Sequence, residues 1–97
     1  MQFEWDSRKA AANLRKHGVA FADAVTVFAD PLARTFTDPD HSEREYRELI
    51  VGYDQTHRLL IASFAERGDN VRIISARRAT AREIHVHEEH VKRPRQR

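Results

Sequence analysis

The stretch Val71-Arg72-Ile73-Ile74-Ser75-Ala76-Arg77-Arg78 decides how this chain folds. It is an apolar run rich in β-branched residues, which is typical of a strand buried largely on both faces. Two arginines follow at the point where the strand leaves the core. A guanidinium stays charged at physiological pH and matches two phosphate oxygens with paired donors. The stretch therefore predicts a buried strand that presents arginines to a phosphodiester, with a solvent-facing ion pair as the plainer alternative.

The arginines of this strand are not equivalent, because side chains alternate between the two faces of a sheet. Alternation places Arg72 and Arg78 on one face and Arg77 on the other, in phase with Val71 and Ile73. The pattern therefore predicts one phosphate-binding arginine, Arg77, and two that are structural or face a partner.

The segments around this strand predict more of the sheet and a final helix. Thr80-Ala81-Arg82-Glu83 has the Thr-x-x-Glu spacing of a capping box, which indicates a helix over residues 81–91. Upstream, two further strand patterns cover residues 44–53 and 58–65, and turn-like residues separate the three strands. We expect an antiparallel meander.

The N-terminal third predicts a strand and two helices. Phe3 and Trp5 alternate with polar residues, and Asp6 then has the place of an N-cap for a helix that Gly18 closes. Residues 21–28 have the apolar spacing of a second helix, and residues 33–37 read as an edge strand. The expected fold class is α+β, with two N-terminal helices packed on an antiparallel sheet and a C-terminal helix.

Length and composition indicate one small cytoplasmic domain. The chain has 97 residues, 40% of them hydrophobic, and no cysteine, which fits a reducing compartment and excludes a thiol nucleophile. No apolar stretch reaches the roughly 20 residues of a membrane span, and the first residues lack the order of a signal peptide. We expect a single domain over residues 1–91 and a basic, disordered tail over residues 92–97.

Positive charge is concentrated in the last third of the chain. Residues 71–97 hold eight Arg or Lys against three Glu, whereas residues 1–70 hold nine against twelve Asp or Glu. A cationic field around one strand and helix favours a polyanion such as nucleic acid. No helix-turn-helix recognition pattern is visible, so direct DNA binding by this chain alone is the weaker interpretation.

Several motifs occur together in a fixed order along the chain. They are Phe3-Glu4-Trp5-Asp6 with Lys9 and Asn13, Lys16-His17-Gly18-Val19 with Phe21 and Ala24, Val27-Phe28 before Asp30-Pro31, His41-Ser42 with Glu45 and Arg47, Gly52, and residues 71–77. This set resembles the BrnT family of toxins from bacterial type II toxin-antitoxin modules.

The resemblance implies a RelE-like fold and a ribonuclease that cleaves mRNA without a metal or other cofactor and so inhibits translation. It also implies a BrnA-like antitoxin with a ribbon-helix-helix part, through which the complex contacts operator DNA. The alternative is a catalytically weak binding module that acts as a corepressor with its antitoxin. One position departs from the family, because His87 stands where the family usually has Tyr.

Metal-free RNA cleavage needs cationic donors for the phosphoryl oxygens and groups that move protons. We expect Arg77 and Arg47 to stabilise the phosphate, with His41, Glu45 or His87 as the proton-transfer groups. Further RNA contacts are expected from four residues: Arg72, Arg78, Lys9 and His17.

Each of these roles has a structural alternative. A cation at His17 would cap a helix C-terminus, and Glu45 and Arg47 could pair with charges on a neighbouring strand. The run His85-Val86-His87-Glu88-Glu89-His90 resembles a metal-ligand motif, but on a helix only His87 and His90 share a face. Two ligands fall short of a catalytic zinc site, so no metal site is expected.

Overall fold

The computed structural model describes residues 1–39 and 46–92, which form an α+β fold as the sequence predicts. The elements follow one another along the chain as β1 (Gln2–Glu4), α1 (Ser7–His17), α2 (Phe21–Val27), β2 (Arg34–Thr37), β3 (Glu48–Tyr53), β4 (Leu59–Arg67), β5 (Asn70–Arg78) and α3 (Ala81–Lys92). The predicted start of the third strand at residue 44 and most of the predicted tail lie outside the described residues.

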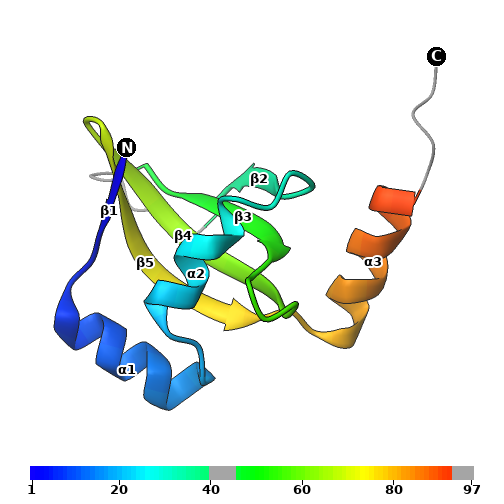
Figure 1. Ribbon diagram of the computed structural model, residues 1–97, viewed down its shortest axis with the longest axis horizontal. Coiled ribbons are helices and arrows are strands. Elements are labelled where there is room, and N and C mark those ends of the chain that lie inside the picture. Colours follow the sequence, from blue (N-terminus) through cyan, green and yellow to red (C-terminus); the bar gives the residue numbers. More distant parts are fainter. Residues whose placement is uncertain (40–45, 93–97) are drawn as a thin grey trace.

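The strands form one sheet in the order β1-β5-β4-β3-β2 (Figure 1). β2 to β5 are an antiparallel meander, but β1 pairs with β5 in parallel, with Phe3 opposite Val71. The predicted antiparallel sheet therefore has one parallel pair, at the β1 edge. Two parallel strands need a long connection between them, and here the whole chain from α1 to β4 forms that connection.

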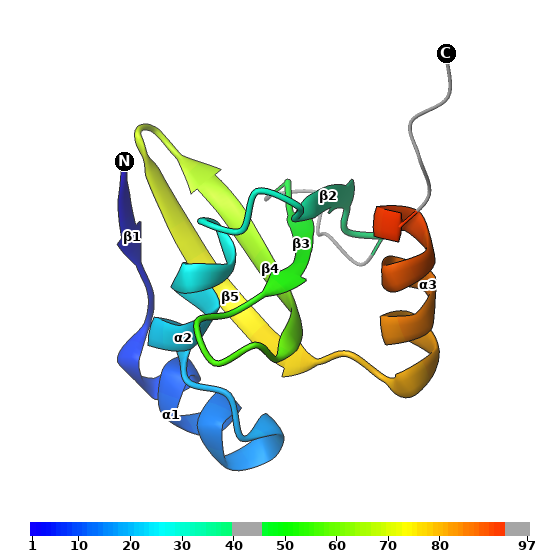
Figure 2. The ribbon, with the colours of Figure 1, turned by 45° about the vertical axis from the view of Figure 1, so that its right-hand side comes forward.

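Helices α1 and α2 cover one face of the sheet (Figures 1 and 2). α3 lies on the other side, where Glu83 contacts Arg77 of β5 and His87 contacts Arg34 of β2. The core between helices and sheet is built by Val19, Phe21, Ala24, Val27, Ile50, Leu60, Ala62, Phe64, Val71, Ile73 and Ala76. The ring of Phe28 packs against those of Phe3 and Phe64, each with centroids 5.0 Å apart. Only His87 of α3 is buried, as its thin apolar stripe indicates.

Local signals explain where α1 begins and ends. The Asp6 carboxylate accepts hydrogen bonds from the backbone amides of Arg8 (2.8 Å) and Lys9 (3.1 Å), which otherwise have no helical partner. Gly18 follows the last turn with φ of 70°, a left-handed conformation that favours glycine. Both predicted helix boundaries are confirmed.

A β-bulge in β5 reverses the facing of its last residues. Phe64 of β4 pairs with Ile73, but the preceding Ser63 pairs with Ser75, so Ile74 is an extra residue. Val71 and Ile73 point into the core, and after the bulge Ala76 takes the same face. Arg77 therefore lies on the face opposite the core.

The bulge corrects the predicted distribution of arginines. Regular alternation put Arg77 in phase with Ile73 and grouped Arg72 with Arg78. In the structure Arg72 and Arg77 share the face away from α1 and α2, and Arg78 is in phase with the buried Ala76 and Leu60. The one extra residue, Ile74, thus places Arg77 on the face of the sheet opposite the core.

No helix within the described ranges is long and apolar enough to cross a membrane.

Candidate functional site

The sheet face away from α1 and α2, here called the open face, carries Leu49, Val51, Ile61, Ser63, Ser75 and Arg77. A pocket of about 410 Å³ opens on it. Its lining residues are His17, Asp38, Pro39, Arg47, Leu49, Ile61, Ser63, Ser75, Ala76 and Arg77. The pocket therefore joins Arg77 with a second arginine, Arg47, and a histidine, His17, at what we call the polar pocket.

Two side chains hold Arg77 and its strand in place, and the first is Glu83 of α3. The Arg77 Nη1 and Nη2 atoms donate to Glu83 Oε1 and Oε2, each at 2.9 Å. Hydrogen bonds from Arg77 lower the pKa of the Glu83 carboxyl to about 2, and the same hydrogen bonding raises the pKa of Arg77. Both side chains are therefore charged across the physiological range.

The second side chain is that of Asn13 of α1, which binds the backbone next to Arg77. β1 pairs with β5 only as far as Arg72, so Ala76 has no strand partner on that side within the described chain. Asn13 takes this place: its Nδ2 donates to the carbonyl of Ala76 (2.8 Å), and its Oδ1 accepts from the amide of Ala76 (3.1 Å). Because Asn13 is buried, these bonds fix β5 just before Arg77.

Asp38 and Ser63 form the buried floor of the polar pocket. The Ser63 hydroxyl donates to Asp38 Oδ2 at 2.9 Å, and both residues are less than one tenth exposed. Arg47 comes from the segment that leads into β3, and His17 is the last residue of α1, half-buried at the pocket. The pocket thus combines cationic donors with oxygen acceptors.

A second, more apolar groove of about 320 Å³ lies beside the polar pocket. It is lined by Arg34, Leu49, Val51, Ile61, Arg77, Arg82, Glu83 and Val86. Arg77 lines both cavities, so it stands on the ridge between them.

The structure brings together only some of the residues predicted for the site. Arg77, Arg47 and His17 line one pocket. Arg72 lies toward β1, where its Nη1 donates to Glu4 at 3.2 Å, and Lys9 and Arg78 are exposed away from the pocket lining. His41 and Glu45 lie outside the described residues.

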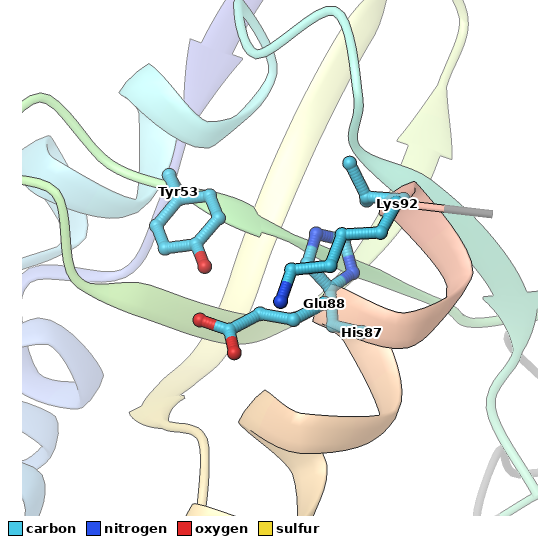
Figure 3. Close-up of a pocket in the computed structure, with 5 residues that line it drawn as sticks. Tyr53, His87, Glu88 and Lys92 are labelled. Carbon is cyan, nitrogen blue, oxygen red and sulfur yellow. The ribbon is translucent and has the colours of Figure 1, made fainter. Parts of the chain in front are cut away.

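His87 is buried at a different place, between α3 and the β2–β3 edge. Its Nδ1 lies 3.5 Å from Arg34 Nη2, and its ring packs edge-on against Tyr53 with centroids 5.7 Å apart. Figure 3 shows Tyr53 on one side of a pocket and His87, Glu88 and Lys92 on the other. His87 does not line the polar pocket, and its Nε2 has no hydrogen-bond partner among the described residues.

Burial, followed by the charge of Arg34, lowers the pKa of His87, while Asp30 and Glu88 oppose the shift. The unfolded chain therefore takes up this proton at a higher pH than the native protein, which makes folding less favourable as the pH falls below about 6.5. We expect the melting temperature to fall from about pH 7 to pH 5 by an amount that shrinks in His87→Gln. His85→Gln, at an exposed position of the same helix, should keep the wild-type slope. Equal slopes in all three proteins would rule out His87 as the source.

Metal-ligating side chains are not grouped in the part of the chain that the structure describes. No group of three or more His, Asp or Glu side chains there has the geometry to hold a metal ion. The histidines of α3 point in different directions, because His87 is buried while His85 and His90 are exposed.

Sequence reasoning missed three residues that shape the site. Asn13 and Glu83 hold Arg77 and its strand, and Asp38 lies in the pocket floor. Glu83 did carry a signal, since the capping box is confirmed: its Oε1 accepts from the Thr80 amide at 2.8 Å, and its own amide donates to the Thr80 hydroxyl at 3.1 Å. The two hydrogen bonds that this carboxylate accepts from Arg77 have no local sequence signature.

Comparisons with known proteins agree on one family. The model of the family described as ribonuclease toxin, BrnT, of type II toxin-antitoxin system matches residues 5–83. The crystal structure of the Brucella abortus ribonuclease toxin BrnT superposes with a TM-score of 0.65 and 26% identity, over 82% of this chain and 97% of that one. No curated protein matches the chain.

Proposed function

Because the chain belongs to the BrnT family of ribonuclease toxins of type II toxin-antitoxin systems, we propose that it is a metal-independent endoribonuclease. It cleaves mRNA in the cytoplasm and inhibits translation, and a BrnA-like ribbon-helix-helix antitoxin neutralises it. The observation that carries this proposal is the convergence of Arg77, Arg47 and His17 on one pocket of the open face.

The arginines supply the electrostatic part of the reaction. The ribose 2′-oxygen attacks the adjacent phosphorus, and negative charge grows on the non-bridging oxygens as the new bond forms. Arg77 is held in place by Glu83, so it meets this charge without reorganising, and Arg47 adds a second cation in the same pocket. The bond to the 5′-oxygen then breaks, which leaves a 2′,3′-cyclic phosphate and a 5′-hydroxyl.

A base must take the proton of the 2′-hydroxyl, and an acid must give one to the departing 5′-oxygen. His17 lines the polar pocket, and imidazole side chains commonly serve as general acids and bases, so it enters the proposal as a proton-transfer group. His41 and Glu45 keep the same proposed role from the sequence. For His87, burial away from this pocket favours a structural role instead.

The remaining cations fit contacts to the flanking RNA backbone. Arg72, Arg78 and Lys9 lie outside the polar pocket, where they can bind phosphates of neighbouring nucleotides without a part in the chemistry. Operator DNA is contacted only through the antitoxin in the complex.

The test is cleavage of RNA by the purified protein in EDTA. We expect fragments with 2′,3′-cyclic phosphate ends to form at the same rate with and without the chelator. Cleavage that needs an added divalent ion would refute the metal-independent mechanism. A protein that binds its antitoxin tightly but cuts no RNA under any condition would instead be the corepressor module.

A further inference from the structure

The hydrogen bonds between Arg77 and Glu83 use one edge of the guanidinium and leave the donors of another edge available. An arginine has five N–H donors in a fixed plane. Nη1 donates to Glu83 Oε1 and, at 3.2 Å, to the carbonyl of Arg78, while Nη2 gives one hydrogen to Glu83 Oε2. The N–H of Nε and the second N–H of Nη2, which are neighbours on one edge, have no acceptor among the described residues. This edge matches two oxygens of a phosphodiester.

The Glu83 carboxylate cannot turn away easily, because the start of α3 fixes it. Oε1 accepts from the Thr80 amide as well as from Arg77 Nη1, and the backbone of Glu83 is bound in turn by the Thr80 hydroxyl. The same carboxylate thus caps a helix and orients the arginine. This contact ties α3 to the edge of the polar pocket, because Arg77 lines that pocket.

We propose that Glu83 is a positioning residue of the ribonuclease site, which holds the Nη1–Nη2 edge of the Arg77 guanidinium so that the adjacent edge, Nε and Nη2, is presented to the RNA phosphate. This inference rests on the proposed function and deepens it. If the salt bridge only fastened α3, removing the charge of Glu83 would leave the rate of RNA cleavage unchanged. The cleavage rate therefore separates a positioning role of Glu83 from a purely structural one.

Glu83→Gln tests the proposal, because the amide keeps an oxygen for the Thr80 amide but loses the charge and one of the two acceptors for Arg77. We expect kcat for cleavage of a short RNA in EDTA to fall about tenfold to a hundredfold, the cost of a misplaced catalytic group, with a smaller change in KM. Glu89→Gln is the matched control: it makes the same exchange at an exposed position of α3 and leaves the Arg77–Glu83 pair, so kcat should stay near wild type.

A double-mutant cycle shows through which residue Glu83 acts. In an Arg77→Lys protein, whose side chain has no fork, Glu83→Gln should cause almost no further loss of kcat. An equal loss in both backgrounds would mean that Glu83 acts independently of Arg77 and would overturn the proposal. A faster Glu83→Gln enzyme would also overturn it, because Glu83 would then compete with RNA for the arginine.

If the wild-type protein cuts no RNA, the proposed function fails, and the role of Glu83 is decided by binding alone. An uncleavable 2′-O-methyl RNA of the same sequence then replaces the substrate. The proposal expects Glu83→Gln to weaken its binding about tenfold in the wild-type background and not in Arg77→Lys. Equal binding by wild type and Glu83→Gln would contradict it.

Discussion

Replacing Arg77 by alanine is expected to lower the rate of RNA cleavage about 10²- to 10³-fold, the usual cost of removing a preorganised donor to a developing oxyanion. Arg77 lines the polar pocket and is the residue on which the bulge, Asn13 and Glu83 act together. Single-turnover cleavage of a defined RNA measures the loss, and relief of growth arrest on expression of the variant measures it in cells.

The Arg77 variant should remain folded and bind its antitoxin, because the lost ion pair is between side chains that are 41% and 36% exposed and adds little to stability. Arg8→Ala, which removes an exposed arginine of α1, is the matched control and should cleave RNA like the wild type. Full toxicity of a folded Arg77→Ala protein would remove Arg77 from the mechanism.

Asn13→Ala is expected to destabilise the protein by about 3 kcal/mol, because it leaves the buried amide and carbonyl of Ala76 without partners. The carbonyl of Val19, which accepts from Asn13 at 2.9 Å, loses its partner as well. Urea unfolding measures the change, and Arg15→Ala at an exposed position of α1 is the control. Hydrogen exchange should locate the effect, with the Ala76 amide losing protection first.

The same variant should also cleave RNA more slowly at temperatures where it is folded, since β5 is no longer fixed before Arg77. A substitution at Asn13 that left both stability and the protection of Ala76 unchanged would show that β5 holds its shape without this side chain.

Local signals in the sequence predicted the helices well. Asp6 and Gly18 mark the ends of α1 because a cap and a left-handed residue act within a few positions. The Thr80-x-x-Glu83 box marks the start of α3 for the same reason. The meander from β3 to β5 followed from strand patterns separated by turn residues.

The facing of Arg77 could not be predicted in this way. The extra residue Ile74 is defined only by how β5 pairs with β4, since alternation within residues 71–78 looks regular. The parallel pairing of β1 depends likewise on contacts with a strand far along the chain. Of the residues predicted for the site, the polar pocket unites Arg77, Arg47 and His17. The roles of Asn13 and Glu83 were not predicted, because Asn13 binds Ala76, 63 residues away, and Glu83 binds Arg77, 6 residues away.

The binding of a phosphate by Arg77 is tested most directly by the nuclear magnetic resonance signal of the Arg77 Nε–H group during titration with a 2′-O-methyl RNA. We expect this resonance to move downfield as a phosphate accepts its hydrogen, while the Arg8 Nε–H resonance stays in place. An RNA that binds the protein without moving the Arg77 signal would contradict the assignment of this arginine to the phosphate.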